Sequence, residues 1–185
     1  MSQPSGSDSN SSQAPGHTER ERLERTAARY AVAFPADRPD AFRAHLAVVR
    51  TGTAMARAVT SFLAARHEIN TARYSLLRAL YFADGRKLSQ SDLARELAVT
   101  SPNVTQLIDA LETEGYVERV VSETDRRVTF ARLTPDGERR CAELVPAMAG
   151  FIEATTEALS TEELQELTAL LEKLRENLPQ PGETD

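Results

Sequence analysis

The 185-residue sequence predicts a mainly α-helical protein with one small β-hairpin. Most of the chain repeats its apolar residues every three or four positions, which is the spacing of an amphipathic helix. Residues 116–133 are instead rich in β-branched and aromatic residues, with turn-forming residues between two such runs. Hydrophobic residues make up 41% of the chain and charged residues 27%, which are the proportions of an ordinary globular domain.

The N-terminal part divides into a tail and a leading helix. Residues 1–17 are rich in Ser, Gln, Pro and Gly, a composition that predicts a disordered tail. They lack the basic start and apolar centre of a secretory signal, so we expect a cytoplasmic protein. Residues 18–34 have helical periodicity, and Pro35 and Pro39 prevent its continuation.

Two further helices are predicted before the middle of the chain. Residues 40–66 and residues 71–83 both place apolar side chains three and four positions apart, and Gly85 is suited to close the second helix. No apolar run approaches the roughly 18 residues that a membrane-spanning helix needs, so no membrane association is expected.

The next segment predicts two short helices joined by a tight turn. The first opens with Ser89 three residues before Asp92, which is a variant of the capping box. For the second helix we expect Ser101 at the N-cap, Pro102 at the first helical position and Gly115 at a left-handed stop.

The second of these helices has one apolar and one polar side. Its apolar residues are expected to face inward: Val104, Leu107, Ile108 and Leu111. Its polar residues lie elsewhere on the helix: Asn103, Thr105, Gln106 and Asp109. Two short helices with hydrogen-bonding groups at the start of the second can place base-reading side chains in a major groove. The alternative is a helical hairpin with a merely solvated polar face.

The hairpin completes a known combination of elements. Residues 116–121 and 127–133 predict its strands, and the turn between them is followed by two arginines, Arg126 and Arg127. Two helices followed by such a hairpin predict a winged helix-turn-helix, here over residues 71–134. Arginine at the tip of a wing can enter a narrow minor groove, and Asp125 could orient its guanidinium. The alternative is a surface ion pair.

Charge is distributed unevenly along the chain. The net charge is −6, which alone argues against a nucleic-acid partner. Residues 153–185, however, contain nine acidic and two basic residues, whereas the first 152 residues contain nineteen acidic and twenty basic ones. The acidity therefore belongs mainly to the C-terminal end. Residues 119–132 contain four arginines against two acidic residues, so this stretch is locally basic.

The C-terminal part predicts two helices with apolar stripes. The first stripe comprises Cys141, Leu144, Val145, Met148, Ile152, Thr155 and Leu159. The second follows a capping box at residues 160–163 and comprises Leu164, Leu167, Leu171, Leu174 and Leu178. Leucines at alternating spacings of three and four form a narrow seam that suits another helix. We therefore expect residues 40–66 and 135–178 to form a helical dimerisation region.

Three motifs stand within residues 88–137: Leu-x-x-x-Leu-Glu-x-x-Gly-Tyr-Val from Leu107 to Val117, Asp-Arg-Arg at 125–127 and Leu-Thr-Pro-x-Gly from Leu133 to Gly137. Through these motifs the segment resembles the DNA-binding core of the MarR family, the multiple antibiotic resistance regulators. It implies an obligate homodimer on a palindromic duplex, with the second helix in the major groove and Arg127 in the minor groove. The expected DNA-binding residues are Ser101, Pro102, Asn103, Thr105, Gln106, Asp125, Arg126 and Arg127.

The resemblance also implies a repressor that a small aromatic or anionic effector releases from DNA. Candidate ligand residues are His45, Arg50, Arg73, Tyr74 and Arg78, because arginine can hold a carboxylate and tyrosine can stack on a ring. Urate is not expected, since the chain has no tryptophan and carries Ser75 and Leu107 where urate-responsive members have charged groups.

Other functional classes have weaker support. The three histidines are scattered, and neither a Gly-rich phosphate loop nor a catalytic triad is evident, so we expect no enzyme, metal or cofactor. Cys141 leaves a redox-sensing regulator as one alternative, although burial in the dimer interface would make its thiol inert. A dimeric winged-helix module that binds a protein instead of DNA is the other alternative.

Overall fold

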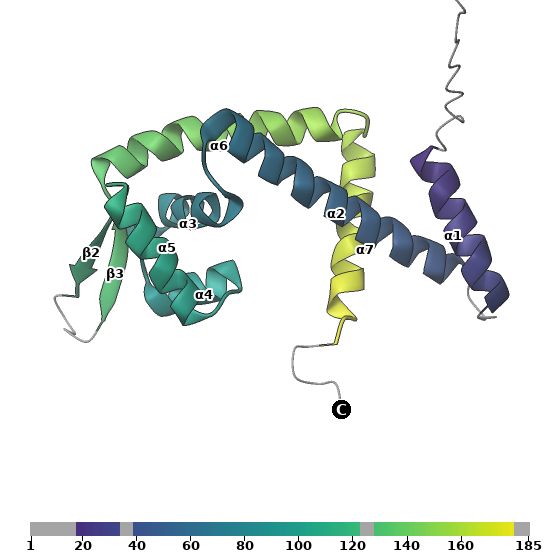
Figure 1. Cartoon of the computed structure of the whole chain (residues 1–185), viewed down its shortest axis with the longest axis horizontal. Coiled ribbons are helices and arrows are strands. Elements are labelled where there is room, and N and C mark those ends of the chain that lie inside the picture. Colours follow the sequence, from purple (N-terminus) through teal and green to yellow (C-terminus); the bar gives the residue numbers. More distant parts are fainter. Residues whose placement is uncertain (1–17, 34–38, 123–127, 180–185) are drawn as a thin grey trace, which may run out of the picture. The chain divides into compact units, whose positions relative to one another are not determined.

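The computed structural model describes residues 18–33, 39–122 and 128–179, and the predicted tail, residues 1–17, lies outside this part (Figure 1). Over the described residues the chain forms seven α-helices, a short 3₁₀ turn and three strands. The predicted class, mainly helical with a small β-wing, is confirmed. The chain divides into two compact units, residues 1–65 and 66–185.

The first unit contains α1 (Glu19–Ala33) and most of α2 (Pro39–His67). The leading helix is confirmed by α1, and α2 extends one residue beyond the prediction at each end. The rings of Tyr30 and Phe42 stack with centroids 4.2 Å apart, and Arg43 forms an ion pair of 3.2 Å with Glu24. These contacts pack α1 against the start of α2.

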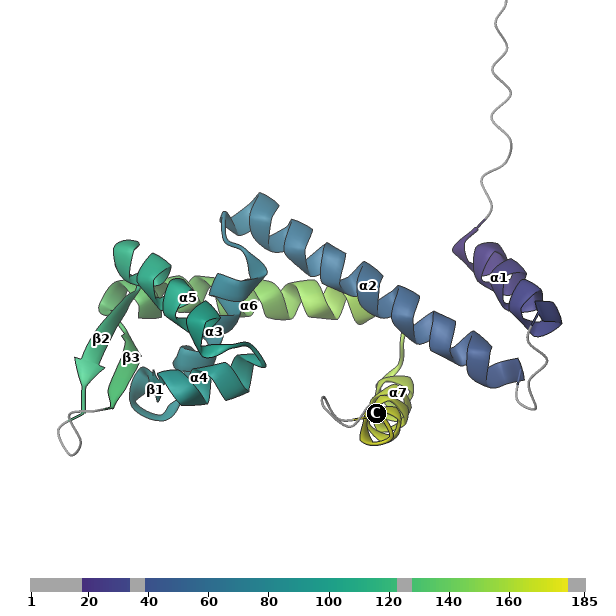
Figure 2. The ribbon, with the colours of Figure 1, turned by 60° about the horizontal axis from the view of Figure 1, so that its bottom comes forward.

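The second unit packs its helices around a leucine-rich core. It contains α3 (Thr71–Phe82), α4 (Gln90–Leu97), α5 (Ser101–Thr113) and α6 (Pro135–Thr156), and Figures 1 and 2 show α5 beside β2 and β3. Its fully buried side chains include Leu76, Leu77, Leu80, Leu93, Val104, Leu111, Val117, Cys141 and Leu144. This core fixes α5 between α4 and the sheet.

The sheet has three antiparallel strands in the order β1-β3-β2. The predicted hairpin is confirmed by β2 (Val117–Val121) and β3 (Thr129–Leu133). The short edge strand β1 (Lys87–Ser89) was not predicted and pairs with β3, Lys87 opposite Arg132. Three residues are too few to show the period of a strand, and here pairing with β3 decides the conformation.

Two predicted helix ends need correction. Thr100 is the N-cap of α5, with extended φ and ψ of −74° and 152°, so Ser101 is already helical and Pro102 comes second. Proline is tolerated there because the first four N–H groups of a helix have no partner within it. At the end of α3 the cap is Ala83, and Gly85, with φ of 62°, lies in the following 3₁₀ turn.

The other predicted caps are confirmed. Ser89 accepts a hydrogen bond from the Asp92 N–H at 3.1 Å and donates its hydroxyl to the Asp92 carboxylate at 2.6 Å. Gly115 has φ of 79° and ends α5 in the left-handed conformation that glycine adopts without steric cost.

The segment Leu133–Gly137, at the start of α6, holds this helix against the turn between α5 and β2. Thr134 caps α6 by accepting from the Gly137 N–H at 3.1 Å, and its hydroxyl donates to the Gly115 carbonyl at 2.6 Å. A β-carbon at Gly137 would lie 2.0 Å from the Tyr116 carbonyl oxygen. The Leu-Thr-Pro-x-Gly motif therefore needs glycine for close packing.

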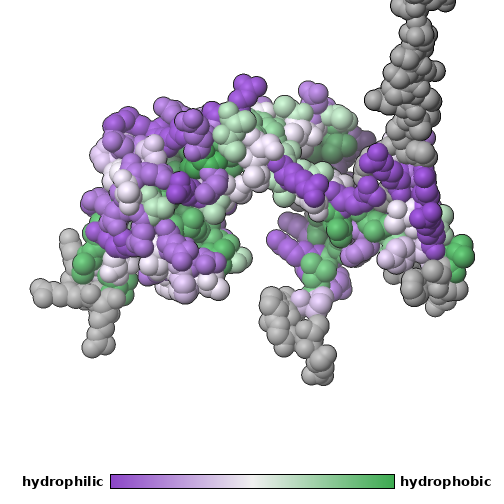
Figure 3. Space-filling view, in the orientation of Figure 1, coloured by the Kyte–Doolittle hydropathy of each residue, from purple (hydrophilic) through white to green (hydrophobic). Residues whose placement is uncertain are grey.

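The C-terminal helices change from buried to exposed along the chain. On α6, Cys141, Leu144 and Met148 are buried, whereas Ile152 near its end is exposed. No residue of α7 (Thr161–Glu176) is buried, and Figure 3 shows its apolar residues at the surface. None of the helices in the described ranges is long and apolar enough to cross a bilayer.

Candidate nucleic-acid interface

A left-handed turn joins α4 to α5. Ala98 has φ of 52°, and the N–H groups of Ala98 and Val99 both donate to the Ala94 carbonyl. Leu93 on α4 and Ile108 on α5 are buried, so the two helices share the core of the unit. The predicted helix-turn-helix is therefore present, with α5 in the position of the recognition helix.

The start of α5 exposes most of its predicted DNA-binding residues. Ser101, Pro102, Asn103 and Gln106 are exposed to solvent. Thr105 is half-buried, and its hydroxyl donates to the Ser101 carbonyl at 3.1 Å while accepting from the side-chain amide of Gln90. Thr105 and Gln90 of α4 therefore stabilise the start of α5. The exposed amides of Asn103 and Gln106 remain available for contacts outside the protein.

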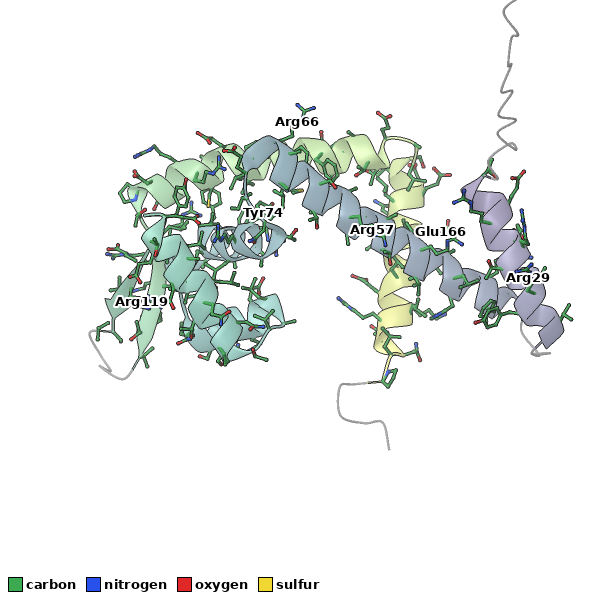
Figure 4. The ribbon with its side chains drawn as sticks, viewed as in Figure 1. Arg29, Arg57, Arg66, Tyr74, Arg119 and Glu166 are labelled. Atoms are coloured by element: carbon green, nitrogen blue, oxygen red, sulfur yellow. The ribbon has the colours of Figure 1, made fainter. Side chains whose placement is uncertain are left out.

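The second half of α5 is held by an arginine of the wing. Arg119 lies on β2 (Figure 4). It forms ion pairs with both Asp109 and Glu112. The hydrogen bond to Asp109 is the largest cause that raises the pKa of the Arg119 guanidinium. A second arginine, Arg73 of α3, pairs with Glu114 at 2.6 Å and fixes the end of the helix.

The wing is described only along its two strands. The backbone N–H of Ser122 donates to the Val128 carbonyl at 2.9 Å, which continues the ladder toward the tip. The predicted tip residues Asp125, Arg126 and Arg127 lie outside the described residues. Arg132 on β3 forms an ion pair of 2.8 Å with Glu118 on β2.

A small cleft of about 200 Å³ lies between α3, α4 and α5. Its lining combines apolar side chains with one cation and one anion: Ala72, Ser75, Arg78, Glu96, Leu97, Val99 and Leu107. Among the five candidate ligand residues, the cleft lining includes Arg78. Arg73 is engaged with Glu114, and Tyr74 is buried, which raises the pKa of its hydroxyl.

The remaining two candidates lie on α2, where His45 is exposed and Arg50 is half-buried. They belong to the first unit, whereas the cleft belongs entirely to the second. Their part in ligand binding stays a prediction.

Cys141 is buried inside one chain, not at the surface that was expected to form the dimer interface. Its thiol lies 3.6 Å from the Leu77 carbonyl, and burial raises the pKa of the thiol to about 11. Arg86 and Arg140 lower this pKa, but less than burial raises it. Within the described residues no group of three His, Cys, Asp or Glu side chains could hold a metal ion.

Sequence reasoning missed Arg119 and Gln90 as parts of this interface. Arg119 follows Asp109 by ten residues, and Gln90 precedes Thr105 by fifteen, so no local spacing brings them together. The available signal was the charge of α5, which contains two carboxylates and no basic residue.

Comparison with known proteins supports this interpretation of the geometry. A family model of the MarR family matches residues 67–128. The HTH-type transcriptional regulator MhqR of Bacillus subtilis is 30% identical over 115 residues, covering 62% of this chain and 78% of MhqR. The transcriptional repressor MprA of Escherichia coli is 30% identical over 112 residues, covering 60% of this chain and 64% of MprA.

A solved structure has the same fold. Sco3205, a MarR family transcriptional regulator from Streptomyces coelicolor solved in complex with DNA, aligns with a TM-score of 0.66 at 21% identity. The alignment covers 94% of this chain and 96% of Sco3205. These relatives are transcriptional regulators and not enzymes. The chain described here belongs to the MarR family of winged helix-turn-helix transcriptional regulators.

Proposed function

We propose that this protein is a homodimeric regulator that binds a palindromic DNA sequence and represses the adjacent genes. The exposed polar start of α5 carries the proposal. Asn103 and Gln106 present amides of the kind that pair with adenine in the major groove. Ser101 and Pro102 stand in the first turn, where a helix N-terminus can approach a phosphate. Gln90 and Thr105 hold this turn in place.

The wing supplies the second groove contact in this proposal. Arg127 would enter the minor groove beside the major groove that α5 occupies, with Asp125 and Arg126 next to it. This contact rests on the sequence motif. It predicts that Arg127→Ala weakens binding and lowers its salt dependence, because one cation near the phosphates is lost.

Fluorescence anisotropy with the duplex upstream of the protein's own gene tests the proposal. The wild type should bind it more tightly than a scrambled duplex, and its affinity should fall steeply with salt. Asn103→Ala/Gln106→Ala should reduce the ratio of the two affinities by about 10- to 100-fold. Thr113→Ala, at the exposed end of the same helix, is the matched control and should leave that ratio unchanged.

Two results of these DNA-binding measurements would contradict the proposal. Equal affinity for both duplexes, with no enriched sequence in a random-sequence selection, would refute sequence-specific binding. Binding that is insensitive to salt and to Arg127→Ala would favour the protein-interaction alternative.

The proposed second copy covers the leucine stripe of α7. Leu167, Leu171 and Leu174 are all exposed in one chain and follow one another at spacings of four and three. Such a seam suits the equivalent seam of another helix, and a two-fold axis would place two winged domains on half-sites about 34–36 Å apart. Light scattering should give a dimer for the wild type and for Gln165→Glu, and a monomer for Leu171→Glu. A monomeric wild type would exclude the proposed homodimer.

The proposed effector occupies the cleft between α3, α4 and α5. Arg78 could pair with a carboxylate, and Leu97 and Leu107 offer apolar contact to a ring. Because Leu107 belongs to α5, a ligand in this cleft can favour a geometry that binds DNA poorly. By thermodynamic linkage, bound DNA must then lower the affinity of the protein for the ligand by the same factor. Calorimetric titration with benzoate should show weaker binding to the DNA complex than to the free protein. Equal affinities would exclude a release mechanism.

A further inference from the structure

The exposed side of α5 changes from neutral to acidic along its length. Asn103, Gln106, Asp109 and Glu112 follow one another at intervals of three, so each is a neighbour of the next and the row winds around the helix from its start to its end. All four are exposed, and α5 contains no lysine or arginine. DNA phosphates that approach the second half of α5 would lie near the carboxylates of Asp109 and Glu112, and like charges close together disfavour binding.

Arg119 compensates for this charge from a neighbouring element. One guanidinium nitrogen contacts the Asp109 carboxylate and another contacts the Glu112 carboxylate. The Arg119 side chain keeps 34% of its surface exposed, so solvent still reaches it. A guanidinium has five N–H donors, and these two contacts occupy two of them. Arg119 can therefore offer a further donor to a phosphate while it holds both acids.

The same contacts fix the orientation of α5 relative to the wing. Arg119 lies on β2, and β2 follows α5 after a tight turn at Gly115. A planar guanidinium that contacts two carboxylates on successive turns permits few relative orientations of helix and strand. Because α5 and the wing would enter adjacent grooves, this orientation determines the register of the protein on DNA.

We propose that Arg119 is a positioning residue for DNA binding, which cancels the charge of Asp109 and Glu112 and holds α5 at the correct angle to the wing. This inference rests on the proposed function, because it presupposes that α5 faces DNA. It assigns Arg119 a role beyond the stability of the folded chain.

The chain offers a matched control on the adjacent strand. Arg132 of β3 also forms an ion pair across the sheet, with Glu118, and its side chain is similarly exposed at 44%. Among the described contacts, none joins Arg132 to α5. Arg132→Ala therefore removes one positive charge and one surface ion pair from the wing without releasing Asp109 or Glu112.

Anisotropy titrations with the duplex upstream of the protein's own gene would compare these variants. Arg119→Ala should weaken binding about 30-fold, whereas Arg132→Ala should weaken it by less than about five-fold. Arg119→Ala/Asp109→Asn/Glu112→Gln should recover most of the lost affinity, because it removes the exposed carboxylates. Arg119→Lys should be intermediate, since one ammonium cannot bridge two carboxylates as a guanidinium does.

Thermal unfolding separates this role from stability. Should Arg119→Ala fail to fold, Asp109→Asn/Glu112→Gln retains Arg119 but frees it from α5. That variant should bind scrambled DNA more tightly and discriminate against it about ten-fold less than the wild type. Unchanged discrimination would overturn the positioning role.

The outcomes distinguish the inference from the proposed function. Selective wild-type binding with unchanged affinity in Arg119→Ala would overturn the role of Arg119 and leave the regulator intact. Equal weakness of Arg119→Ala and the triple variant would overturn the charge compensation, because removal of the two carboxylates would then bring no gain in affinity. Absence of selective binding by the wild type would refute the proposed function, and the role of Arg119 with it.

Discussion

Leu111 of α5 and two leucines of α7, Leu170 and Leu171, lie in opposite environments. Leu111 of α5 is fully buried, whereas Leu170 of α7 keeps 58% of its surface exposed and Leu171 keeps 42%. Both helices are amphipathic and of similar length, 13 and 16 residues. A periodic apolar stripe thus identifies the face that a helix can bury, but it does not identify the surface that covers it.

The difference follows from what surrounds each helix within one chain. The apolar side of α5 packs against α3, α4 and β2. For α7, no residue is buried within the described parts of the chain, although its capping box is complete. Helix formation and burial are therefore separate steps here, and only α5 completes both within a monomer.

Truncation of one leucine in each helix should give the largest change in stability that this contrast predicts. Leu111→Ala should lower the free energy of unfolding by about 3 kcal/mol at any protein concentration, because it opens a cavity inside one chain. Leu171→Ala should reduce stability by an amount that depends on protein concentration, since its proposed partner is a second copy. Urea unfolding at two concentrations, about 100-fold apart, measures both.

A concentration-independent loss of similar size in both variants would contradict the comparison. It would mean that α7 is covered by its own chain. A loss below about 0.5 kcal/mol for Leu171→Ala at both concentrations would mean that nothing covers it.

Two glycines of α6 sharpen the contrast within one helix. A β-carbon at Gly137 would collide with the Tyr116 carbonyl, whereas one at Gly150 would meet no atom within 4 Å. Gly137→Ala should therefore cost about 2 kcal/mol, and Gly150→Ala should stabilise the protein by about 0.5–1 kcal/mol through helix propensity. Thermal unfolding of both variants checks this, and the same sign of change for both would contradict it.

Local sequence signals predicted most helices to within one or two residues. The period of the apolar residues located α2 and α3, and the capping patterns at Ser89 and Ser160 marked the starts of α4 and α7. These signals work because the groups that cap a helix lie within four residues of its end. The exposed start of α5 followed from the same periodicity.

Contacts between distant residues could not be predicted in the same way. The edge strand β1 depends on pairing with β3, and the bridge from Arg119 to α5 depends on the angle between two elements. Cys141 was assigned to an apolar stripe correctly, but its burial against α3 requires knowledge of how α6 packs. The cleft at Arg78 likewise requires three helices at once.

The N-cap of α4 predicts a smaller effect at the edge of the packed unit. Ser89→Ala should cost about 1 kcal/mol, because the Asp92 N–H loses its side-chain acceptor. The hydrogen bond from Ser89 is also the first cause that lowers the pKa of Asp92 below its ordinary 3.8. A lowered pKa contributes stability above pH 3.8 that is lost as pH falls through the folded value.

Acid unfolding therefore distinguishes the variants. Ser89→Ala should show a weaker loss of stability between pH 5 and 3 than the wild type, measured by urea unfolding at each pH. Ser91→Ala, two residues along the chain, is the control, because Ser91 is not the N-cap of α4. In the described contacts its hydroxyl forms a hydrogen bond with the Ser89 hydroxyl alone. Parallel curves for Ser89→Ala and wild type would exclude the assigned pKa effect.

The thiol of Cys141 should show the smallest functional effect. With a pKa of about 11, about one thiol in ten thousand is ionised at pH 7, and burial restricts access to it. A thiol reagent should therefore react slowly with the native protein and leave DNA binding unchanged. Cys141→Ala/Ala169→Cys moves the thiol to the exposed α7 and should react fast. If the two proteins reacted equally fast, Cys141 would be accessible through opening of the packed unit, and the redox alternative would regain its basis.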